Sequence, residues 1–126
     1  MIPQDLRYSQ EHEWAKIDGD QITVGITDFA QEQLGEVTFV ELPVEGQKIK
    51  SGDSMGAIES SKAASDVFSP VSGTISQVNS ELEDAPELLN DACYEGGWIC
   101  KIQFADAAQL DKLMDAKAYD QYLKGL

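Results

Sequence analysis

The chain has 126 residues, of which 42% are hydrophobic and 25% are charged, a length and composition that fit one globular domain over residues 1–126. Its 23 acidic and 9 basic residues give a formal net charge of −14, which repels nucleic-acid backbones and anionic membrane surfaces, so we expect neither as a partner. The longest apolar runs span only a few residues, which excludes a transmembrane helix.

The cysteines and the N-terminal segment favour a cytoplasmic protein without a metal site. Cys93 and Cys100 are separated by six residues, a spacing that matches no zinc or redox motif, and a single histidine, His12, cannot complete a metal-binding set. We therefore expect two reduced structural thiols. Residues 1–8 contain one arginine and no apolar run, so they resemble neither a signal peptide nor a transit peptide. If the chain starts at its natural methionine, a cytoplasmic bacterial protein is the simplest prediction.

Short strands separated by turns are predicted from about residue 13 to residue 104. Ile22, Val24 and Ile26 alternate with polar or small residues, a pattern typical of a strand with one buried face. Another strand is expected over residues 37–42, because a turn rich in proline and glycine follows it. The core is therefore predicted to be mainly β.

Two short helices are predicted among these strands. Asp28 can cap a helix over residues 29–34, and Gly35 would end that helix at the position where glycine is favoured. A proline at the first helical position predicts another helix over residues 86–90.

The C-terminal part of the chain changes from strand periodicity to helix periodicity. Apolar side chains at every second position from residue 98 to residue 104 predict a final strand. At about residues 106–124 the apolar spacing becomes helical, and Asp115 can cap the second of two helices. Tyr119 and Tyr122 lie at these helical spacings, so we expect them to pack on the sheet rather than to stack on a cofactor.

Lys62 differs from the other seven lysines because the residues on both sides of it are small. Small neighbours leave the lysine stem unobstructed, and two acidic residues, Glu59 and Asp66, flank the run. The segments 44–49 (Val-x-Gly-x-x-Ile) and 71–75 (Val-x-Gly-x-Ile) echo each other, which places Lys62 at the tip of a hairpin near a pseudo-twofold axis. On this local pattern alone, an ordinary surface lysine and a presented attachment site both stay open, and the former is more common.

The run Gly-Ala-Ile-Glu-Ser-Ser-Lys-Ala-Ala-Ser-Asp at residues 56–66 resembles the lipoylation segment of the glycine cleavage system H proteins. Ser61 departs from the valine that is common before the modified lysine, and Gln33 stands where some relatives have histidine. Further segments resemble the family in the same order along nearly the whole chain, namely His12-Glu13-Trp14 and residues 24–31, 34–37, 39–43, 69–73, 78–79, 86–90 and 97–98.

This resemblance implies a fold, a cofactor and a function. The implied fold is mainly β, a barrel-sandwich hybrid of the lipoyl/biotinyl type with short flanking helices and a C-terminal helical segment. The implied cofactor is lipoic acid, attached as an amide to Lys62, and the chain would be a non-catalytic carrier rather than an enzyme. It would take the aminomethyl group of glycine from the PLP-dependent glycine decarboxylase (P protein) to the tetrahydrofolate-dependent aminomethyltransferase (T protein).

The resemblance also implies further partners and a cleft for the arm. Dihydrolipoamide dehydrogenase (L protein) would reoxidise the arm, and a lipoate ligase or a lipoyl/octanoyl transferase would attach it to a monomeric carrier. By position, Glu13, Ile26 and Asp66 match residues that line the cleft into which the family folds its loaded arm. A carboxylate there could pair with the terminal ammonium and keep water away from it. Ordinary surface acids are the alternative for Glu13 and Asp66.

Several other functions compete with this one, among them a plain interaction module whose lysine stays unmodified. A biotin carrier shares the fold but places methionine on both sides of its lysine, where this chain has Ser61 and Ala63. An H-like protein that only relays lipoyl groups is the closer alternative. An enzyme with a Ser-Lys pair is disfavoured, because a lysine acts as a base only when desolvation lowers its pKa from about 10.4.

Overall fold

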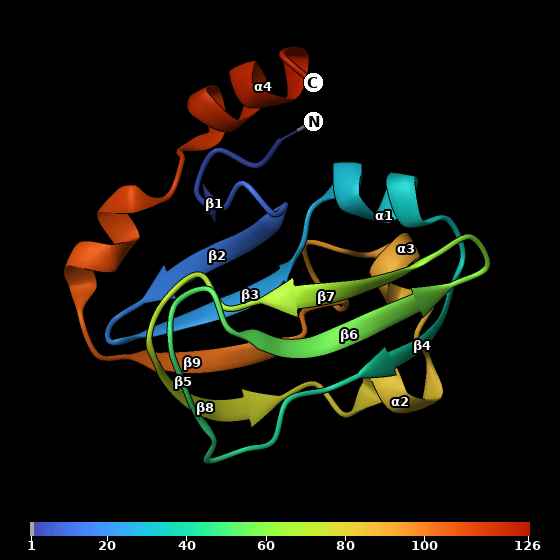
Figure 1. Ribbon diagram of the computed structural model, residues 1–126, viewed down its shortest axis with the longest axis horizontal. Coiled ribbons are helices and arrows are strands. Elements are labelled where there is room, and N and C mark those ends of the chain that lie inside the picture. The colour runs from blue at the N-terminus through green and yellow to red at the C-terminus, as the bar shows by residue number, and fades with distance from the viewer. Residues whose placement is uncertain (1) are drawn as a thin grey trace.

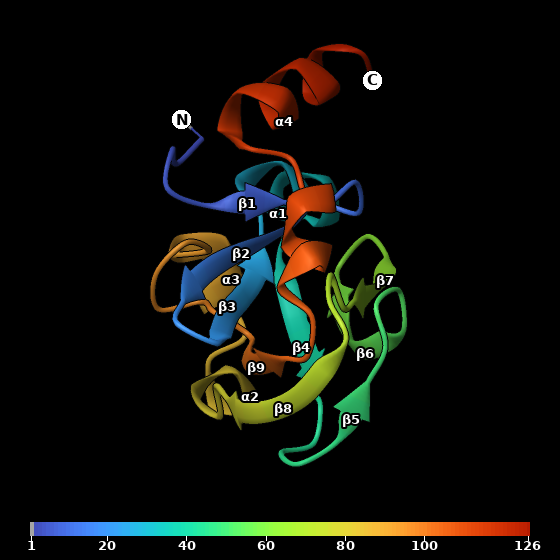
Figure 2. The same ribbon diagram turned by 90° about the vertical axis from the view of Figure 1, so that its left-hand side faces the viewer.

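The computed structural model describes residues 2–126 and shows two antiparallel sheets surrounded by short helices (Figures 1 and 2). The predicted mainly β architecture is confirmed. The larger sheet contains, in spatial order, β1 (Arg7–Tyr8), β2 (Glu13–Asp18), β3 (Gln21–Ile26), β9 (Cys100–Phe104), β8 (Gly73–Val78) and β5 (Lys48–Ile49). The smaller sheet contains β4 (Val37–Glu41), β6 (Ser54–Ser60) and β7 (Ala64–Phe68). Because β1 belongs to the larger sheet, the β region begins before the expected start at about residue 13.

The predicted strand around Val24 is confirmed as β3, which lies between β2 and β9. The last strand begins at Cys100 instead of the predicted Trp98. The carbonyl oxygen of Trp98 accepts a hydrogen bond of 2.8 Å from Asn79 Nδ2, so a side chain occupies the place of a strand partner. Asn79 directly follows β8, and the regular pairing of the last strand with both β8 and β3 starts at Cys100.

The first helix, α1 (Asp28–Leu34), is capped by Thr27 rather than by the predicted Asp28. Thr27 has the extended backbone of an N-cap residue, and its Oγ1 accepts a hydrogen bond of 3.3 Å from Ala30 N. Asp28 lies in the first turn, where its negative charge is favourable near the helix dipole. Gly35 ends the helix as predicted, with a φ of 78° that glycine adopts without strain.

Two four-residue helices, α2 (Glu81–Asp84) and α3 (Leu88–Asp91), lie between β8 and β9. Helix α2 was not predicted, because four residues are too few to show a helical period. Helix α3 begins two residues after the predicted start at Pro86. Leu89 N donates to Pro86 O at 3.1 Å, so the chain makes a tighter turn there before the helix begins.

The C-terminal segment consists of a 3-10 helix, η1 (Ala107–Lys112), and helix α4 (Ala116–Lys124). Asp115 caps α4 as predicted, since its Oδ1 accepts a hydrogen bond of 2.8 Å from Ala118 N. Met114 was expected on a helix but is extended, because its backbone exchanges two hydrogen bonds of 2.8 Å with Tyr8. This bridge holds α4 beside β1 (Figure 2).

The two echoing segments around Lys62 in the sequence pair with each other. Gly46 N donates to Ile75 O at 2.7 Å, and β5 then pairs with β8 in antiparallel register. The hairpin of β6 and β7 thus starts and ends beside this pair, and its tip lies at the opposite end of the molecule (Figure 1).

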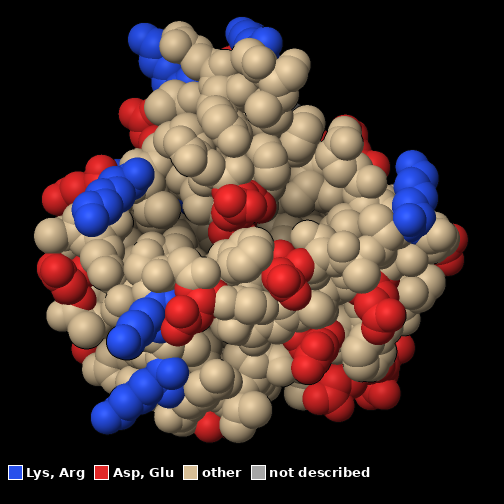
Figure 3. All heavy atoms as spheres, in the orientation of Figure 1, with Lys and Arg blue, Asp and Glu red and all other residues tan. Residues whose placement is uncertain are grey.

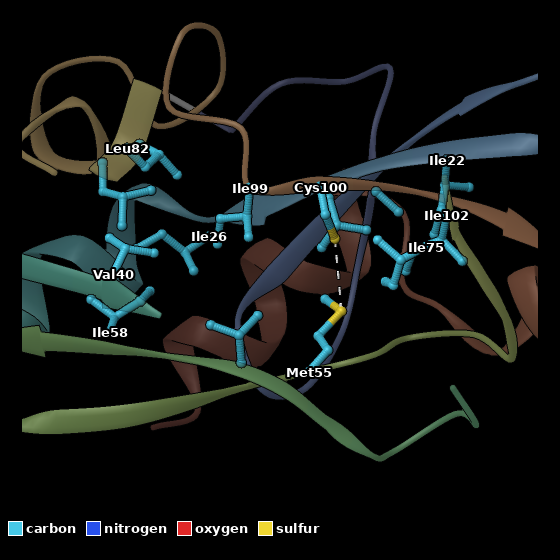
Figure 4. Close-up of a cluster of buried hydrophobic side chains, with 14 of the residues drawn as sticks. Ile22, Ile26, Val40, Met55, Ile58, Ile75, Leu82, Ile99, Cys100 and Ile102 are labelled. Carbon is cyan, nitrogen blue, oxygen red and sulfur yellow. Dashed lines mark hydrogen bonds between the residues drawn. The ribbon is translucent and has the colours of Figure 1, made fainter. Parts of the chain in front are cut away.

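The main hydrophobic core fills the space between the two sheets, whereas a second cluster lies under α4. In the second cluster the rings of Tyr8 and Tyr119 stack with centroids 4.6 Å apart. The close-up in Figure 4 labels core side chains of both sheets, among them Ile22, Ile75 and Ile102 from the larger sheet and Val40, Met55 and Ile58 from the smaller.

Acidic side chains are spread over the face shown in Figure 3, while lysine and arginine side chains lie mainly at its edges. This distribution agrees with the net charge of −14. Among residues 2–126, no helix is both long enough and apolar enough to cross a membrane.

Candidate functional site

Lys62 lies at the tip of the hairpin formed by β6 and β7 (Figure 1), and its side chain is exposed. Across residues 2–126 a single ion pair is present, between Lys124 and Asp120, so the Lys62 ammonium has no carboxylate partner. Ser60 shapes the tip. Its Oγ accepts hydrogen bonds from Lys62 N (3.3 Å) and Ala63 N (3.1 Å), and it donates to Ala63 O (2.9 Å). The amine is therefore presented to solvent on a turn that has its own hydrogen bonds.

The hairpin tip rests on the loop that follows α1. Ser61 N donates to Glu36 O at 3.0 Å. The stem of Lys62 runs along Gly35, because a β-carbon on Gly35 would lie 3.2 Å from Lys62 Cε and 3.3 Å from Cδ. The missing side chain at Gly35 leaves a track for the methylene groups of the lysine.

Asn90 of α3 holds this loop from below. Its Oδ1 accepts a hydrogen bond of 2.9 Å from Val37 N, and its Nδ2 donates to Gly35 O at 2.8 Å. The same Nδ2 lies 3.0 Å from Gln31 Oε1, which makes a third hydrogen bond. One half-buried side chain thus fixes the backbone on both sides of the track under Lys62.

A cleft of about 250 Å³ adjoins the hairpin tip. The structure brings Glu13, Ile26 and Asp66 together in its lining, with Ala63 and Ala64, which directly follow Lys62. Most of the remaining lining consists of apolar side chains of α1, β6 and β7. The attachment position predicted from the sequence and the cleft predicted for the arm are therefore neighbours on the surface.

The three cleft residues differ in their surroundings. Ile26 is a buried apolar wall, and Asp66 is exposed at the rim, where it also borders a separate hollow beside β4 and β6. Glu13 is only 3% exposed, so it is not the surface acid that the sequence left as an alternative. Its Oε1 accepts a hydrogen bond of 2.5 Å from Ser9 Oγ, and its Oε2 accepts one of 3.1 Å from Phe68 N.

Burial controls the charge of Glu13. Loss of water raises the pKa of its carboxyl to about 7, although the hydrogen bonds from Ser9 and Phe68 act in the opposite direction. Because Glu13 belongs to β2 and Phe68 to β7, the carboxyl also bridges the two sheets at the cleft. A cation that entered the cleft would favour the ionised carboxylate.

The cysteines lie away from this cleft and are both buried and free. Burial raises the pKa of Cys100 to about 12 and that of Cys93 to about 11, so neither is a ready nucleophile. Across residues 2–126, no three His, Cys, Asp or Glu side chains converge on a position that could hold a metal ion.

Comparison with known proteins decides the family. The model of the family described as glycine cleavage H-protein matches residues 6–126. The chain belongs to the glycine cleavage H-protein family. It is 52% identical over 123 residues to the glycine cleavage system H protein of Anaeromyxobacter sp. (strain K), which covers 98% of this chain and 96% of that relative. It is 50% identical over 122 residues to the H protein of Parvibaculum lavamentivorans, with 97% of this chain and 98% of the relative covered.

A solved structure of the family has the same fold. The crystal structure of a glycine cleavage system H protein from Mycobacterium marinum matches with a TM-score of 0.89 at 37% identity, and the match covers 99% of this chain and 100% of that one. The predicted barrel-sandwich hybrid is thereby confirmed. H proteins are the lipoyl carriers of the glycine cleavage system, which disfavours the biotin carrier considered above.

Within this H-protein fold, several residues of the site had no role assigned from the sequence. Ser60 was considered as a small neighbour and as a possible member of a Ser-Lys pair, but not as the residue that shapes the turn, although a serine before a tight turn often bonds to the following backbone N–H groups. Asn90 and Tyr119 act through contacts across more than 50 positions in the chain, and no local pattern reveals them. His12 lines the cleft, and its single occurrence in the sequence was used only to exclude a metal site.

Proposed function

We propose that this chain is the lipoyl-bearing carrier of the glycine cleavage system, with lipoic acid attached as an amide to Lys62. The position of Lys62 carries the proposal, since it combines an exposed amine on a hairpin tip with a cleft beside it. The ammonium has no ion pair among the described residues, so amide formation breaks none. The small neighbours leave the side of the stem that faces away from Gly35 open to a modifying enzyme.

The proposed partners follow from this assignment. Glycine decarboxylase (P protein) would load the aminomethyl group, aminomethyltransferase (T protein) would receive it, and dihydrolipoamide dehydrogenase (L protein) would reoxidise the arm. A lipoate ligase or a lipoyl/octanoyl transferase would modify Lys62. When bound, the lipoyl group supplies the disulfide and dithiol chemistry, and this chain contributes reach and shelter rather than catalysis. A monomeric state and a cytoplasmic location stay predictions.

We assign Glu13, Ile26 and Asp66 to the binding of the aminomethyl end of the arm. The cleft of about 250 Å³ beside the hairpin tip is the space that we assign to the dithiol end with its one-carbon cargo. Ile26 offers an apolar wall for the sulfur-bearing end. Glu13 and Asp66 offer carboxylates for the ammonium, and Glu13 does so where water is scarce.

Intact-mass measurement on the protein produced with its lipoate-attaching enzyme tests the attachment. We expect the mass of one lipoyl amide, lost in Lys62→Arg and retained in Lys50→Arg, a matched change at another exposed lysine. A mass increase that persists in Lys62→Arg, or the mass of biotin, would contradict the assignment. Exchange of labelled bicarbonate into glycine with purified glycine decarboxylase then separates a carrier from a lipoyl relay, because only the carrier supports exchange.

A further inference from the structure

Helix α4 reaches the cleft through one buried hydroxyl group. The oxygen of Tyr119 lies 2.9 Å from His12 Nδ1 and 2.7 Å from Thr27 Oγ1. Tyr119 belongs to α4, Thr27 caps α1, and His12 lines the cleft. A residue 107 positions away in the sequence thus contacts the cleft wall directly.

The positions of the hydrogen atoms follow from the acceptors that are present. Thr27 is fully buried, and its Oγ1 already accepts from Ala30 N. Within the described range 2–126, the Thr27 proton has only the Tyr119 oxygen as acceptor. The Tyr119 proton is then left for His12 Nδ1, which must accept it. His12 is therefore the neutral tautomer with its proton on Nε2.

Packing holds the His12 ring in place. Its centroid lies 4.6 Å from that of Phe29, 5.8 Å from that of Tyr119 and 5.9 Å from that of Tyr122. The backbone of His12 has a φ of 68°, an uncommon conformation for a residue other than glycine that is found at functional sites. Burial lowers the pKa of the imidazole, although the nearby Glu11 acts in the opposite direction.

We propose that Tyr119 is a positioning residue of the arm cleft, which holds His12 as a neutral Nε2–H donor that helps to retain the loaded lipoyl arm. This inference deepens the proposed function and rests on it. A loaded dithiol arm has two polar ends, an ammonium on the aminomethyl group and the free sulfur. Glu13 suits the ammonium as acceptor, and His12 suits the sulfur as donor, whereas an imidazolium would repel the cargo.

The tautomer can be tested without any cofactor. His12 is the only histidine, so long-range proton–nitrogen NMR spectra of the ¹⁵N-labelled protein report on one ring without assignment. We expect an acceptor Nδ1 and a protonated Nε2 at pH 7.5. Tyr119→Phe should give a mixture of tautomers. A protonated Nδ1 in the parent, or an unchanged tautomer in Tyr119→Phe, would overturn the inference.

Tyr8→Phe is the matched control for the hydroxyl. The Tyr8 ring stacks on Tyr119 at an interplanar angle of 7°, but its hydroxyl donates to Pro3 O and lies outside the cleft. Each variant removes one buried hydroxyl, so both should lower the thermal unfolding temperature by about 2–6 °C. Only Tyr119→Phe should change the His12 spectrum, which separates positioning from a general loss of stability.

Release of the cargo tests retention. In water, the loaded thioether S–CH2–NH3⁺ reacts with H2O to give the thiol, formaldehyde and NH4⁺, and formaldehyde can be trapped and measured. We expect release to be about 3–10-fold faster in Tyr119→Phe and unchanged in Tyr8→Phe. His12→Asn should match Tyr119→Phe, because asparagine tolerates the positive φ and its amide oxygen can accept from Tyr119, but its amide NH2 lies nearer the backbone than Nε2 and reaches less far into the cleft.

The same series separates the two proposals. If the parent protein and Glu13→Gln both release formaldehyde as fast as loaded free lipoamide, the cleft does not protect the cargo. Both the assignment of Glu13 and the proposed role of Tyr119 would then be wrong. If the parent is protected and Glu13→Gln is not, while Tyr119→Phe equals the parent, the carrier cleft stands and the role of Tyr119 is overturned.

Discussion

The hairpin tip around Lys62 and the end of the cleft around Glu13 are neighbours, yet they are built in opposite ways. At the tip, exposed small residues make short-range hydrogen bonds, such as those from Lys62 N and Ala63 N to Ser60 Oγ. At the cleft, a carboxyl with 3% exposure bonds to a backbone group 55 positions away. Presenting a lysine requires only a stable turn. Holding a cation out of water requires a buried charge, which destabilises the fold that provides it.

Of the substitutions considered, Glu13→Gln should change the stability of the protein most. Burial raises the pKa of Glu13 to about 7, so the folded chain binds this proton more tightly than the unfolded chain. The free energy of unfolding contains the full contribution of this proton below pH 4.5 and loses it as the pH rises through about 7. The loss between these limits is about 3 kcal/mol. Glutamine stays neutral and can accept from Phe68 N while donating to Ser9 Oγ. We therefore expect the free energy of unfolding of Glu13→Gln to exceed that of the parent by about 3 kcal/mol at pH 8. At pH 5 the difference should be less than about 1 kcal/mol.

Urea unfolding at these two pH values measures the effect. Asp66→Asn is the control, because it neutralises an exposed carboxylate of the same cleft and should change stability by less than about 0.5 kcal/mol at either pH. Equal free energies of unfolding of Glu13→Gln and the parent at pH 8 would show that the buried, ionised carboxyl does not destabilise the fold. The proposed difference between tip and cleft would then be wrong.

Gly35→Ala should have an intermediate effect at the junction of the two regions. The alanine must adopt the φ of 78° and ψ of −154° of Gly35, a conformation that costs a residue other than glycine about 1–3 kcal/mol, and its β-carbon contacts the Lys62 stem. Gly46→Ala isolates the backbone effect, since Gly46 has a φ of 87° and a β-carbon there meets nothing within 4 Å. A double-mutant cycle with Lys62→Ala should give a coupling of about 0.5 kcal/mol for Gly35. The same cycle with Gly46→Ala should give no coupling free energy. Equal couplings at both glycines would show that the Lys62 stem makes no specific contact with Gly35.

Ser60→Ala should have the smallest effect on stability. It removes three hydrogen bonds at an exposed turn, so we expect a loss of about 1 kcal/mol or less, together with a lipoylation rate that falls about 2–5-fold because the tip is less ordered. Ser61→Ala is the control, since Ser61 contributes a backbone N–H and that group is unchanged. Initial rates of modification by a purified lipoate ligase provide the measurement, and equal rates in both variants would rule out a role for the Ser60 hydroxyl.

Local chemistry made much of this molecule predictable. The alternation at Ile22, Val24 and Ile26, the stop at Gly35 and the cap at Asp115 all depend on a few adjacent residues, and the structure confirms each of them. The tip position of Lys62 followed from the two echoing segments on either side of it, residues 44–49 and 71–75. Thr27 was missed as a cap because two capping residue types stand side by side, and only the backbone angles decide between them.

What could not be predicted depends on contacts between distant segments. The burial of Glu13 results from the end of β7 lying over the start of β2, and the three hydrogen bonds of Asn90 require α3 to lie under the loop after α1. The hydrogen bond between Tyr119 and His12 depends on the bridge between β1 and Met114. A strand of two residues is too short to give a recognisable sequence pattern, so this bridge could not be predicted. Family resemblance named Glu13 and Asp66 together, whereas their unequal exposure became clear only in three dimensions.

The track along Gly35 limits the range of conformations of the Lys62 side chain. A free lysine side chain loses up to about 2 kcal/mol of rotamer entropy when it is ordered. Because Cγ, Cδ and Cε of Lys62 already lie against Gly35, part of that loss has occurred before any arm enters the cleft. For the proposed lipoyl arm, the attachment point is therefore already confined on the Gly35 side, and less side-chain entropy is left to lose when the arm enters the cleft.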